Sequence, residues 1–439
     1  MYLRRHHIQN VKLLRDVMID FVDANGEPRM WTVFVGENRL CKTTLLQTIA
    51  AAAYGVDRGT NLATGTVASW TDLRNPVALM IESEFGFSED RHHIRTYPGL
   101  PRSPVCEPPI LTSTLMLGPN RSIFAGGSRL RGPAGASPDN ADPLTEVRST
   151  WTPDWFVAAY GTSRHLPAGN KAMPEPIDRM RPLFGGDLTS TNFVDRFDAE
   201  LGRHFAKVLQ SVFIGGGLLP HISQLELRGR GGIRSSKDLI DAERFEMDIR
   251  GNDGKRIRIP AAWLSQGYQS LIAWVADFVG HILLEHGVLI EAADMEGIVL
   301  VDELDLHLHP TWQVKLIPAL KAVFPRLQFI ATTHSPMLLP ALAAEEVILL
   351  SQDAEGSVVA TPSAQSPALM TGSELYGAFF DIRKLYPEEL GEKLHQYGYL
   401  ATDPTRTEEE DARMHQLAAE LTAGGVALDS APVAREPGA

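Results

Sequence analysis

The sequence predicts an α/β fold with a mixed β-sheet core, in which buried strands end at polar residues and helices follow. Three stretches carry this prediction. An apolar run over 31–35 passes through a short polar loop into a helical pattern over 43–53. Two further apolar runs, 297–301 and 327–331, end directly at polar or charged side chains. Buried strands of this kind are continuous apolar runs joined by helices, so these stretches predict a sheet with helices packed on it.

Composition and charge narrow the class of protein. The chain has 439 residues, of which 44% are hydrophobic and 22% charged, as in globular proteins of one large domain or two to three lobes. No apolar run reaches transmembrane length and no long apolar segment follows the basic N-terminus, so we expect no membrane span and no signal peptide. The formal net charge of −13 does not suit a protein that coats nucleic acid, but it leaves room for a local basic groove.

The two cysteines indicate a reducing compartment. Cys41 and Cys106 give neither a disulfide framework nor the spacing of metal ligands. We therefore expect a cytoplasmic protein.

The first part of the chain alternates strands with loops. Residues 8–22 are expected to form an edge strand, Asn25-Gly26 a hairpin turn, and 30–35 the returning strand. Further strands are predicted over 75–85, 110–117 and 155–160. Low hydrophobicity over 125–142 predicts a mobile surface loop. After the last of these strands, a turn ending at Arg164 is expected to direct that side chain outward.

The middle of the chain changes from helical to period-two patterning. A helix is predicted over 184–215, with a stripe of core residues at helical spacing: Phe193, Phe197, Leu201, Phe205, Val208 and Leu209. Period-two runs over 245–250 and 255–259 flank Asn252-Asp253-Gly254 and predict a hairpin. This region is the most basic of the chain, through Arg228, Arg230, Arg234, Lys255, Arg256 and Arg258. A solvated strand face and a contact with a nucleic-acid backbone both fit it.

The last hundred residues carry shorter patterns. A final strand is predicted over 347–350 and a polar loop over 352–372. Helical patterns occupy 373–399 and 407–421, and the second of these opens on acidic residues that suit a helix N-terminus. The end, 431–439, is expected to be disordered. We expect this region to dock on the rest of the chain or on a partner.

The polar loop after the first apolar strand has the composition of a phosphate-binding loop. It contains Gly36, Glu37, Asn38, Arg39, Leu40, Cys41, Lys42, Thr43 and Thr44. Between a strand and a helix, main-chain N–H groups and the helix N-terminus cradle an anionic phosphate. Lys42 would reach the β- and γ-phosphates, and Thr43 would place its hydroxyl on Mg²⁺. A plain strand–turn–helix is the alternative.

This loop departs from the usual pattern at two positions. Cys41 replaces the glycine that usually precedes the lysine, and Arg39 stands where many such loops carry another glycine. Glycine serves there because the main chain takes a positive φ or lets a phosphate approach closely. A non-glycine residue adopts that geometry at a cost of about 1 kcal/mol or more. Nucleotide binding is therefore expected, while the departures leave fast turnover open.

A second motif, Leu264–Ser270, contains Ser265, Gly267 and Gln269 and stands directly before a helix predicted over 271–286. A serine at a helix start can direct its hydroxyl and the main-chain amides at an anion. On its own, such a serine is equally an ordinary helix cap.

The two later apolar strands deliver side chains that suit phosphate chemistry. Asp302 and Glu303 follow the first strand, as one carboxylate for Mg²⁺ and a neighbouring general base for an attacking water. His334 follows the second strand and can contact a γ-phosphate or orient water. Each group alone has an ordinary structural explanation. His307 and His309 suggest a metal pair, but the absence of further clustered ligands in the sequence argues against zinc.

Taken in order, these four motifs resemble those of the ABC-type ATPase superfamily. Residues 36–43 look like its Walker A motif, 264–270 like its signature, 299–303 like its Walker B motif with the catalytic glutamate, and His334 like its switch histidine. The resemblance covers about residues 1–350. The wording over 302–310 and 332–336 is more specific: it is similar to the stand-alone "AAA family" ATPases related to SMC and OLD-family heads. Several of these belong to bacterial antiphage defence operons such as Septu.

That resemblance implies a mechanism and partners. Two heads would sandwich ATP and Mg²⁺, with Thr43 and Asp302 on the metal, Glu303 activating water and His334 sensing the γ-phosphate. Ser265, Gly267 and Gln269 of a second copy would close over the nucleotide. The output would be a signal to a separate nuclease or toxin, in antiphage defence or DNA repair, with DNA as a further candidate partner. The alternatives are a nucleotide-bound scaffold with little hydrolysis and the ATPase subunit of a membrane transporter.

The resemblance is incomplete. No Q-loop glutamine can be placed, no heptad segment predicts a coiled-coil arm, and no nuclease motif follows His334. We predict four regions: an ATPase lobe over 1–165 with a mobile insertion, a helical and β lobe over 166–290, a lobe over 291–350 that completes the sheet, and a helical extension over 351–439 with a disordered tail.

Overall fold

The computed structural model divides the chain into two compact units, unit 1 over residues 1–372 and unit 2 over 373–439. It describes residues 1–63, 65–66, 69–71, 77–87, 110–119, 124–132, 135–136, 142–149, 155–164, 179–186, 188, 197–219, 222–227, 245–250, 256–260, 264–286, 289–380, 388–426, 428 and 432–433. For 135–136, 222–227, 245–250 and 256–260 it describes the main chain. Cys106, Phe193, the turn over 252–254 and the basic side chains over 228–258 therefore lie outside the described residues.

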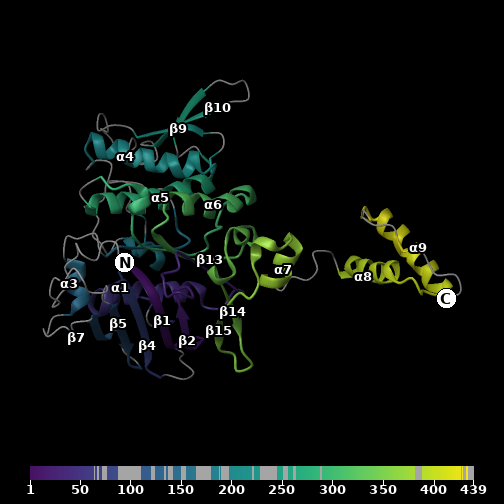
Figure 1. Cartoon of the computed structure of the whole chain (residues 1–439), viewed down its shortest axis with the longest axis horizontal. Coiled ribbons are helices and arrows are strands. Elements are labelled where there is room, and N and C mark those ends of the chain that lie inside the picture. Colours follow the sequence, from purple (N-terminus) through teal and green to yellow (C-terminus); the bar gives the residue numbers. More distant parts are fainter. Residues whose placement is uncertain are drawn as a thin grey trace. The chain divides into compact units, whose positions relative to one another are not determined.

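A six-stranded sheet forms the centre of unit 1 (Figure 1), in the order β15-β14-β3-β13-β12-β8. All neighbours are parallel except β15, which runs antiparallel to β14. Its strands are β3 Trp31–Val35, β8 Val157–Tyr160, β12 Gly297–Val301, β13 Leu327–Thr333, β14 Val347–Gln352 and β15 Val358–Pro362. β3, β8, β12 and β13 are buried along their whole length, as continuous apolar runs predict. The carboxyl ends of these parallel strands meet at one edge, where the phosphate loop and the acidic motif follow β3 and β12.

A second, antiparallel sheet has the order β2-β1-β4-β5-β6-β7. Its strands are β1 Tyr2–Val11, β2 Leu14–Asp20, β4 Leu79–Gly86, β5 Ile110–Leu117, β6 Ala125–Gly132 and β7 Gly135–Ala136. The predicted single strand over 8–22 and its pairing with 30–35 are wrong. β1 pairs with β2 across a tight turn in which Asn10 and Lys12 take φ values of 60° and 51°. β3 has no polar face, so it lies between β13 and β14, where both of its faces are covered.

The prediction of a mobile loop over 125–142 is also wrong for its first part. Ala125–Gly132 forms β6 and pairs with β5 from Ile110 to Met116. The main-chain hydrogen bonds of this pairing need no apolar side chains, so hydropathy alone does not show the strand. A short helix, α3 (Pro143–Ser149), follows.

Helix α1 (Lys42–Leu62) follows the phosphate loop and packs against strands of both sheets. Leu45, Leu46, Ile49 and the alanines over 50–53 are fully buried, so this part of the helix is covered by other elements on every side. Buried His6 lies with Nε2 3.0 Å from Thr48 Oγ1 on α1 and Nδ1 2.7 Å from Ser83 Oγ on β4. Burial lowers the pKa of His6 to about 3, which keeps this link neutral. The predicted end of the helix before Gly55 is a kink, because Gly55 takes φ 75° and the helix then continues.

The helices α4 (Ala199–Gln210), α5 (Gln266–His286) and α6 (Pro310–Val323) form a helical layer of unit 1, on the side of the central sheet opposite α1 (Figure 1). Phe278 on α5 packs edge-on against Phe329 of β13 and Phe324 beside α6. The predicted helix over 184–215 is wrong in its first part: Arg181–Phe184 is a 3₁₀ turn, and α4 starts after Asp198, whose carboxylate caps Glu200 N and Leu201 N. A π-helical turn, Ser211–Gly215, continues α4.

The predicted hairpin over 245–259 is confirmed within a three-stranded antiparallel sheet, β11-β10-β9. Its strands are β9 Ile222–Leu227, β10 Phe245–Arg250 and β11 Arg256–Pro260. The predicted polar loop over 352–372 contains β15 and a 3₁₀ turn, Pro367–Leu369. Further 3₁₀ turns are Ala292–Asp294, Pro336–Ala341 and Ala344–Glu346.

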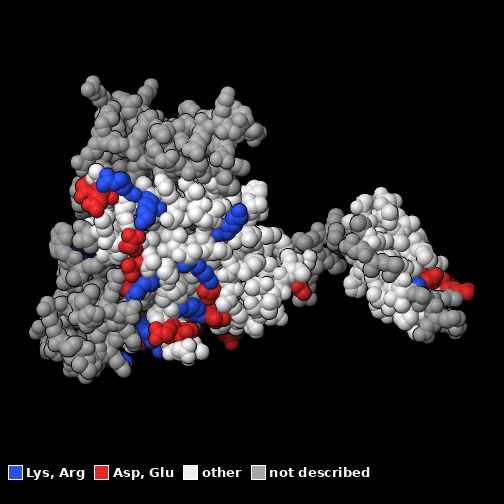
Figure 2. Space-filling model, turned by 45° about the horizontal axis from the view of Figure 1, so that its top comes forward, with Lys and Arg blue, Asp and Glu red and all other residues white. Residues whose placement is uncertain are grey.

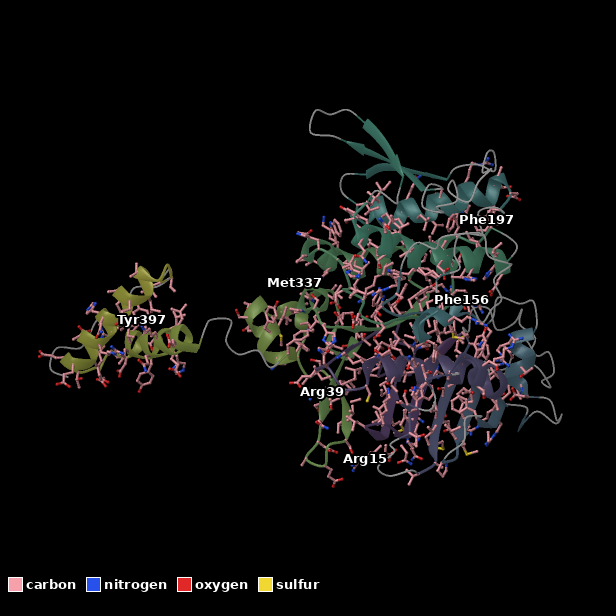
Figure 3. The ribbon with its side chains drawn as sticks, turned by 180° about the vertical axis from the view of Figure 1, so that it is seen from behind. Arg15, Arg39, Phe156, Phe197, Met337 and Tyr397 are labelled. Atoms are coloured by element: carbon pink, nitrogen blue, oxygen red, sulfur yellow. The ribbon has the colours of Figure 1, made fainter. Side chains whose placement is uncertain are left out.

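Unit 2 contains a pair of packed helices. Helix α7 (Gly372–Phe380) stands at its boundary, and α8 (Glu388–Thr402) and α9 (Glu408–Ala423) follow. Thr407 caps α9 in a reciprocal capping box with Glu410, which confirms the helix start at the acidic run. The side chains of α8 and α9, with Tyr397 labelled in Figure 3, share a core: Tyr397, Ala401, Met414, Leu417 and Leu421.

The described surface carries charge of both signs. On the face of unit 1 drawn in Figure 2, Lys and Arg side chains alternate with Asp and Glu side chains. Among the described residues, no helix has the length and apolarity that crossing a membrane requires.

Candidate nucleotide site

The phosphate loop holds two non-glycine residues in the left-handed region. Arg39 takes φ 84° and Cys41 takes φ 58°. These are the two positions where the sequence departs from the glycine-rich pattern, so the loop keeps the shape that glycine would give it and stores strain. Gly36 is needed for space, because a Cβ there would lie 2.8 Å from Leu350 O on β14. Cys41 Sγ contacts Arg39 O at 3.8 Å, a bond within the loop itself.

Lys42 begins α1 and points back into the loop. Its Nζ donates to Gly36 O at 2.7 Å and to Glu37 O at 2.8 Å. Burial lowers the pKa of Lys42, although the nearby carboxylates of Asp302 and Glu303 act in the opposite sense. The loop is thus closed around a buried cation at the place where the sequence predicts phosphate oxygens.

Asp302 lies at the end of β12 and is fixed on both carboxylate oxygens. Thr43 Oγ1 donates to its Oδ2 at 2.6 Å, and Thr332 Oγ1 donates to its Oδ1 at 2.7 Å. Asp302 is only 3% exposed. The structure therefore brings together Thr43 and Asp302, the two residues predicted to hold Mg²⁺, from elements 259 positions apart. A hydroxyl and a carboxylate are hard oxygen donors, which this cation prefers.

Glu303 and His334 lie at the ends of neighbouring strands. Glu303 takes φ 48°, and its N–H donates to Thr332 Oγ1 at 2.7 Å. The main-chain N–H of His334 donates to Asp305 Oδ1 at 3.1 Å. Burial lowers the pKa of His334, and the positive charge of Lys42 lowers it further. The carboxylates of Asp305, Glu303 and Asp302 act in the opposite sense. The imidazole is therefore neutral near pH 7, so one of its ring nitrogens can accept a hydrogen bond.

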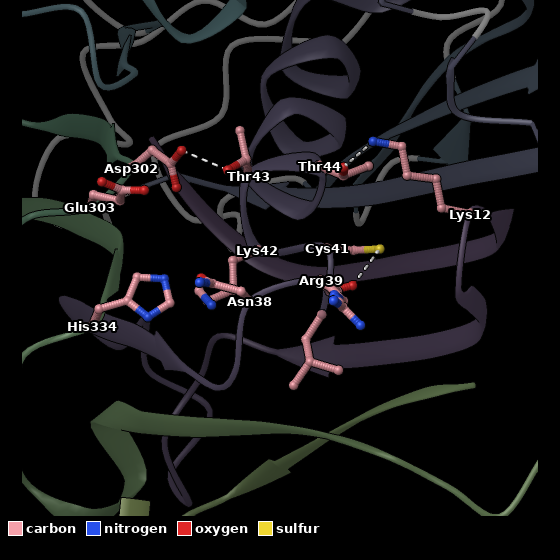
Figure 4. Close-up of a pocket in the computed structure, with 11 residues that line it drawn as sticks. Lys12, Asn38, Arg39, Cys41, Lys42, Thr43, Thr44, Asp302, Glu303 and His334 are labelled. Carbon is pink, nitrogen blue, oxygen red and sulfur yellow. Dashed lines mark hydrogen bonds between the residues drawn. The ribbon is translucent and has the colours of Figure 1, made fainter. Parts of the chain in front are cut away.

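These side chains line one cavity of about 320 Å³ (Figure 4). Its walls are Lys12, Asn38, Arg39, Leu40, Cys41, Lys42, Thr43, Thr44, Asp302, Glu303 and His334. In Figure 4, Asp302, Glu303 and His334 lie on one side of Lys42, and Arg39 and Lys12 on the other. Thr44, predicted with the loop, accepts from Lys12 Nζ at 2.8 Å.

The three residues of the second motif are not among those that line the cavity. Ser265 is exposed beside the start of α5, and Gln269 Nε2 donates to Leu264 O at 2.8 Å. Gly267 is packed so closely that a Cβ would lie 2.2 Å from His307 O. Helix α5 begins at Gln266, five residues earlier than predicted, so the motif is the first turn of the helix.

Three residues of the site were not predicted from the sequence. Lys12 enters from the β1–β2 turn, and no pattern in the sequence marks it. Thr332 accepts from Glu303 N and donates to the carboxylate of Asp302, and its mark in the sequence is a hydroxyl residue at the end of an apolar strand, two positions before His334. The prediction that Arg164 points outward is wrong: it is 2% exposed and its Nη2 donates to Asp302 O, at 3.0 Å, and to Glu303 O. Two carbonyls at a buried strand end require donors, and Arg164 supplies them.

The two histidines after the acidic motif have local roles. His309 caps α6, with Nδ1 2.9 Å from Thr311 Oγ1, and His307 takes φ 64° in the turn before it. Among the described residues, no group of three or more His, Cys, Asp or Glu side chains is placed to hold a metal ion.

A phosphate loop between β3 and α1, with an Asp-Glu pair directly after β12 and a histidine directly after the neighbouring β13, is the arrangement of an ABC-type P-loop ATPase fold. The predicted α/β fold class is confirmed. Residues 194–339 match the protein family described as "AAA domain, putative AbiEii toxin, Type IV TA system".

Named relatives agree with this class. Septu protein PtuA of Bacillus mycoides (strain KBAB4) is 24% identical over 427 residues, which cover 96% of this chain and 50% of the relative. "Retron Ec83 probable ATPase" of Escherichia coli is 32% identical over 161 residues, 37% of this chain and 29% of the relative. The chain thus contains an AAA-family ATPase domain and is homologous to the Septu and retron ATPases, although it spans half or less of the length of these two.

Solved structures of similar arrangement include an SMC head domain from Thermotoga maritima. It is 14% identical, with a TM-score of 0.45, and the match covers 83% of this chain and 100% of that chain.

Proposed function

We propose that this chain is an ATP-binding and ATP-hydrolysing switch subunit of an antiphage defence system. The observation that carries the proposal is the 2.6 Å hydrogen bond from Thr43 to Asp302, which joins the phosphate loop to the acidic motif in a cavity that also holds Lys42, Glu303 and His334. ATP hydrolysis needs a phosphate cradle, a metal position and a general base together. The names of the Septu and retron relatives support the system to which we assign it.

Each residue of the cavity has a distinct role in the proposed hydrolysis. Lys42 gives up its bonds to Gly36 O and Glu37 O and donates to the β- and γ-phosphate oxygens instead. Glu303 accepts a proton from the attacking water, and neutral His334 bonds the γ-phosphate or that water. Thr43 and Asp302 would hold Mg²⁺, which supplies positive charge against the phosphates when bound. The main-chain N–H groups of the loop orient the phosphates at the N-terminus of α1.

The signature motif supports self-association. Ser265 is exposed at the start of α5, outside the cavity, where it is available to a second copy. We propose that two copies enclose the nucleotide, each supplying Ser265, Gly267 and Gln269 to the other. ATP binding would close this dimer and hydrolysis would open it, and a separate effector with nuclease or toxin activity would respond.

The strained loop favours one second candidate. Because Arg39 and Cys41 occupy the left-handed region without glycine, the loop can bind ATP and still align it poorly for hydrolysis. The chain would then be a nucleotide-bound scaffold. Retained ATP without phosphate release is the result that distinguishes this candidate.

The test measures ATP binding and phosphate release by the full chain with Mg-ATP, with and without DNA. Wild type is expected to release phosphate. Lys42→Ala is expected to lose nucleotide binding, because it removes the cation that faces the phosphates. Glu303→Gln is expected to bind ATP, lose at least about a hundredfold in turnover, as loss of a general base implies, and accumulate as a dimer.

Two exposed residues provide matched controls. Lys315→Ala on α6 and Glu355→Gln in the β14–β15 turn remove the same charges away from the cavity, and both should behave as wild type. Equal nucleotide affinity in wild type and Lys42→Ala would refute the assignment of the site.

A further inference from the structure

The main chain at Glu303 is strained and held by other elements. Its φ of 48° is one that side chains other than glycine rarely adopt, and such strain persists only where the surroundings over-determine it. The N–H of Glu303 donates to Thr332 Oγ1 at 2.7 Å, and Leu304 N donates to Thr332 O at 2.8 Å. β13 therefore fixes the amide side of this turn.

Arg164 fixes the carbonyl side of the same turn. Its Nη2 donates to the carbonyls of both Asp302 and Glu303, so one side chain sets the planes of two successive peptides. Arg164 is 2% exposed, and its Nε has no hydrogen-bond partner among the described residues. Among the described residues, the guanidinium donates only to main-chain carbonyls. A buried charge bonded in this way adds little to stability by itself, because its desolvation opposes the bonds it makes.

The turn that carries Arg164 is itself packed in place. β8 ends at Tyr160, whose carbonyl accepts from Asp302 N at 2.8 Å and whose hydroxyl donates to Asp277 on α5 at 2.7 Å. Gly161 lies so close to Pro182 O that a Cβ would stand 2.6 Å from it. The guanidinium thus starts from a fixed strand end beside β12.

We propose that Arg164 is a positioning residue for hydrolysis: it holds the Asp302–Glu303 turn in the left-handed conformation that aims the Glu303 carboxylate into the cavity. Arg164 is not among the residues that line the cavity, so it acts through Glu303 and not on the nucleotide. The catalytic part of this inference rests on the proposed function. The structural part, the fixed turn, does not.

The first experiment is hydrogen exchange of the full chain without nucleotide. The amides of Glu303, Leu304 and Leu306 report on the turn, because each donates to a main-chain or side-chain oxygen within it or on β13. Arg164→Ala is expected to speed their exchange about tenfold or more, since hydrogen bonds from a charged donor are among the stronger ones. Phe329 N, bonded to Met30 O elsewhere in the sheet, is expected to be unchanged.

The second experiment is steady-state hydrolysis of Mg-ATP. Arg164→Ala is expected to lower kcat about tenfold or more with KM within about twofold, because the cavity that binds the phosphates is left intact. Arg164→Lys should recover part of kcat, since an ammonium can reach one carbonyl but not fork between two. In a protein that already carries Glu303→Gln, adding Arg164→Ala should not lower kcat any further. Arg203→Ala, at an exposed site on α4, is the control.

The outcomes separate this inference from the proposed function. Unchanged exchange at Glu303, Leu304 and Leu306 in a folded Arg164→Ala variant overturns the inference even if wild type hydrolyses ATP. Faster exchange with a wild type that never releases phosphate supports the fixed turn and overturns the proposed activity. If Arg164→Ala does not fold, the exchange and kcat of Arg164→Lys decide, and values equal to wild type overturn the proposal.

Discussion

The two halves of the cavity use the same strained conformation but support it differently. In the phosphate loop, Arg39 and Cys41 take φ values of 84° and 58°, and the side chains of Cys41 and Lys42 donate to the loop's own carbonyls. At the end of β12, Glu303 takes φ 48°, and its bonds come from Thr332 on β13 and Arg164 after β8.

From this difference we expect the main chain at Glu303, the proposed base, to be held more firmly than the main chain at Arg39 and Cys41. Strain at Glu303 is balanced by tertiary bonds that exist before any ligand binds. In the loop, the side-chain hydrogen bonds of Cys41 and Lys42 are local, and the tertiary bonds are made by the next residues, Thr43 and Thr44. The main-chain N–H groups of the loop are the groups that a phosphate would bind. A substitution should therefore cost more at the strand end than in the loop.

Among the variants that compare the two halves, Thr332→Val is expected to have the largest effect on the free energy of unfolding. Thr332 is fully buried, and its hydroxyl accepts from Glu303 N and donates to Asp302 Oδ1, both at 2.7 Å. Valine leaves both groups without that partner, so the free energy of unfolding should fall by about 2–3 kcal/mol and kcat by about tenfold or more. Urea unfolding followed by tryptophan fluorescence measures this in unit 1, because all seven tryptophans precede residue 372.

Thr332→Ser is the matched variant, since it keeps the hydroxyl and loses one methyl group. It should stay within about 1.5 kcal/mol of wild type, the usual effect of one buried methylene or methyl. If valine and serine destabilise unit 1 equally, the bonds of Thr332 do not hold the strand end and the contrast with the loop fails.

A smaller effect of opposite sign is expected in the loop from Cys41→Gly. Glycine releases left-handed strain of about 1–2 kcal/mol but raises the entropy of the unfolded chain by about 0.4–1 kcal/mol. The net result should be a gain of about 0.5–1 kcal/mol, together with a rise in phosphate release. Cys41→Ala keeps the Cβ and therefore the strain, so it should match wild type.

Urea unfolding of the two Cys41 variants measures this difference. A glycine variant no more stable than the alanine variant would mean that tertiary contacts hold the loop as they hold Glu303.

The local part of this architecture was predictable from the sequence. The apolar runs before Gly36, Asp302 and His334 are buried parallel strands. The polar and charged residues that follow these strands line one cavity, as their types predict. For positions 39 and 41 the glycine-rich pattern left two explanations, a positive φ or close approach of a phosphate, and the structure has a positive φ at both.

The parts that depend on distant segments were not predictable. The local sequence predicts an exposed turn residue at Arg164. Only the pairing of β8 with β12 brings its guanidinium to the buried carbonyl of Asp302, which needs a hydrogen-bond donor. Residues 8–22 and 30–35 fit a hairpin by turn chemistry, but burial of both faces of β3 assigns it to the other sheet. The Thr332 bonds join residues 29 and 30 positions apart, and strand order, which no single strand encodes, brings them together.

The smallest expected effect tests whether the two halves share one electrostatic site. Burial and then Lys42 lower the pKa of His334, against Asp305, Glu303 and Asp302. Lys42→Ala should therefore raise that pKa, and an NMR titration of the ring, assigned by loss of its signal in His334→Asn, measures the change. Lys315→Ala should leave it unchanged.

The sign of the linked stability effect follows from the same shift. Because folding lowers the pKa of His334 below 6.5, the unfolded chain binds more protons as the pH falls through that value, so this group destabilises the fold on acidification. Raising its pKa in Lys42→Ala should weaken that pH dependence of unfolding. An unchanged titration would mean that the charge of the phosphate loop does not reach the strand ends. The two halves would then be neighbours in space without acting as one site, and a neutral His334 would owe its state to burial alone.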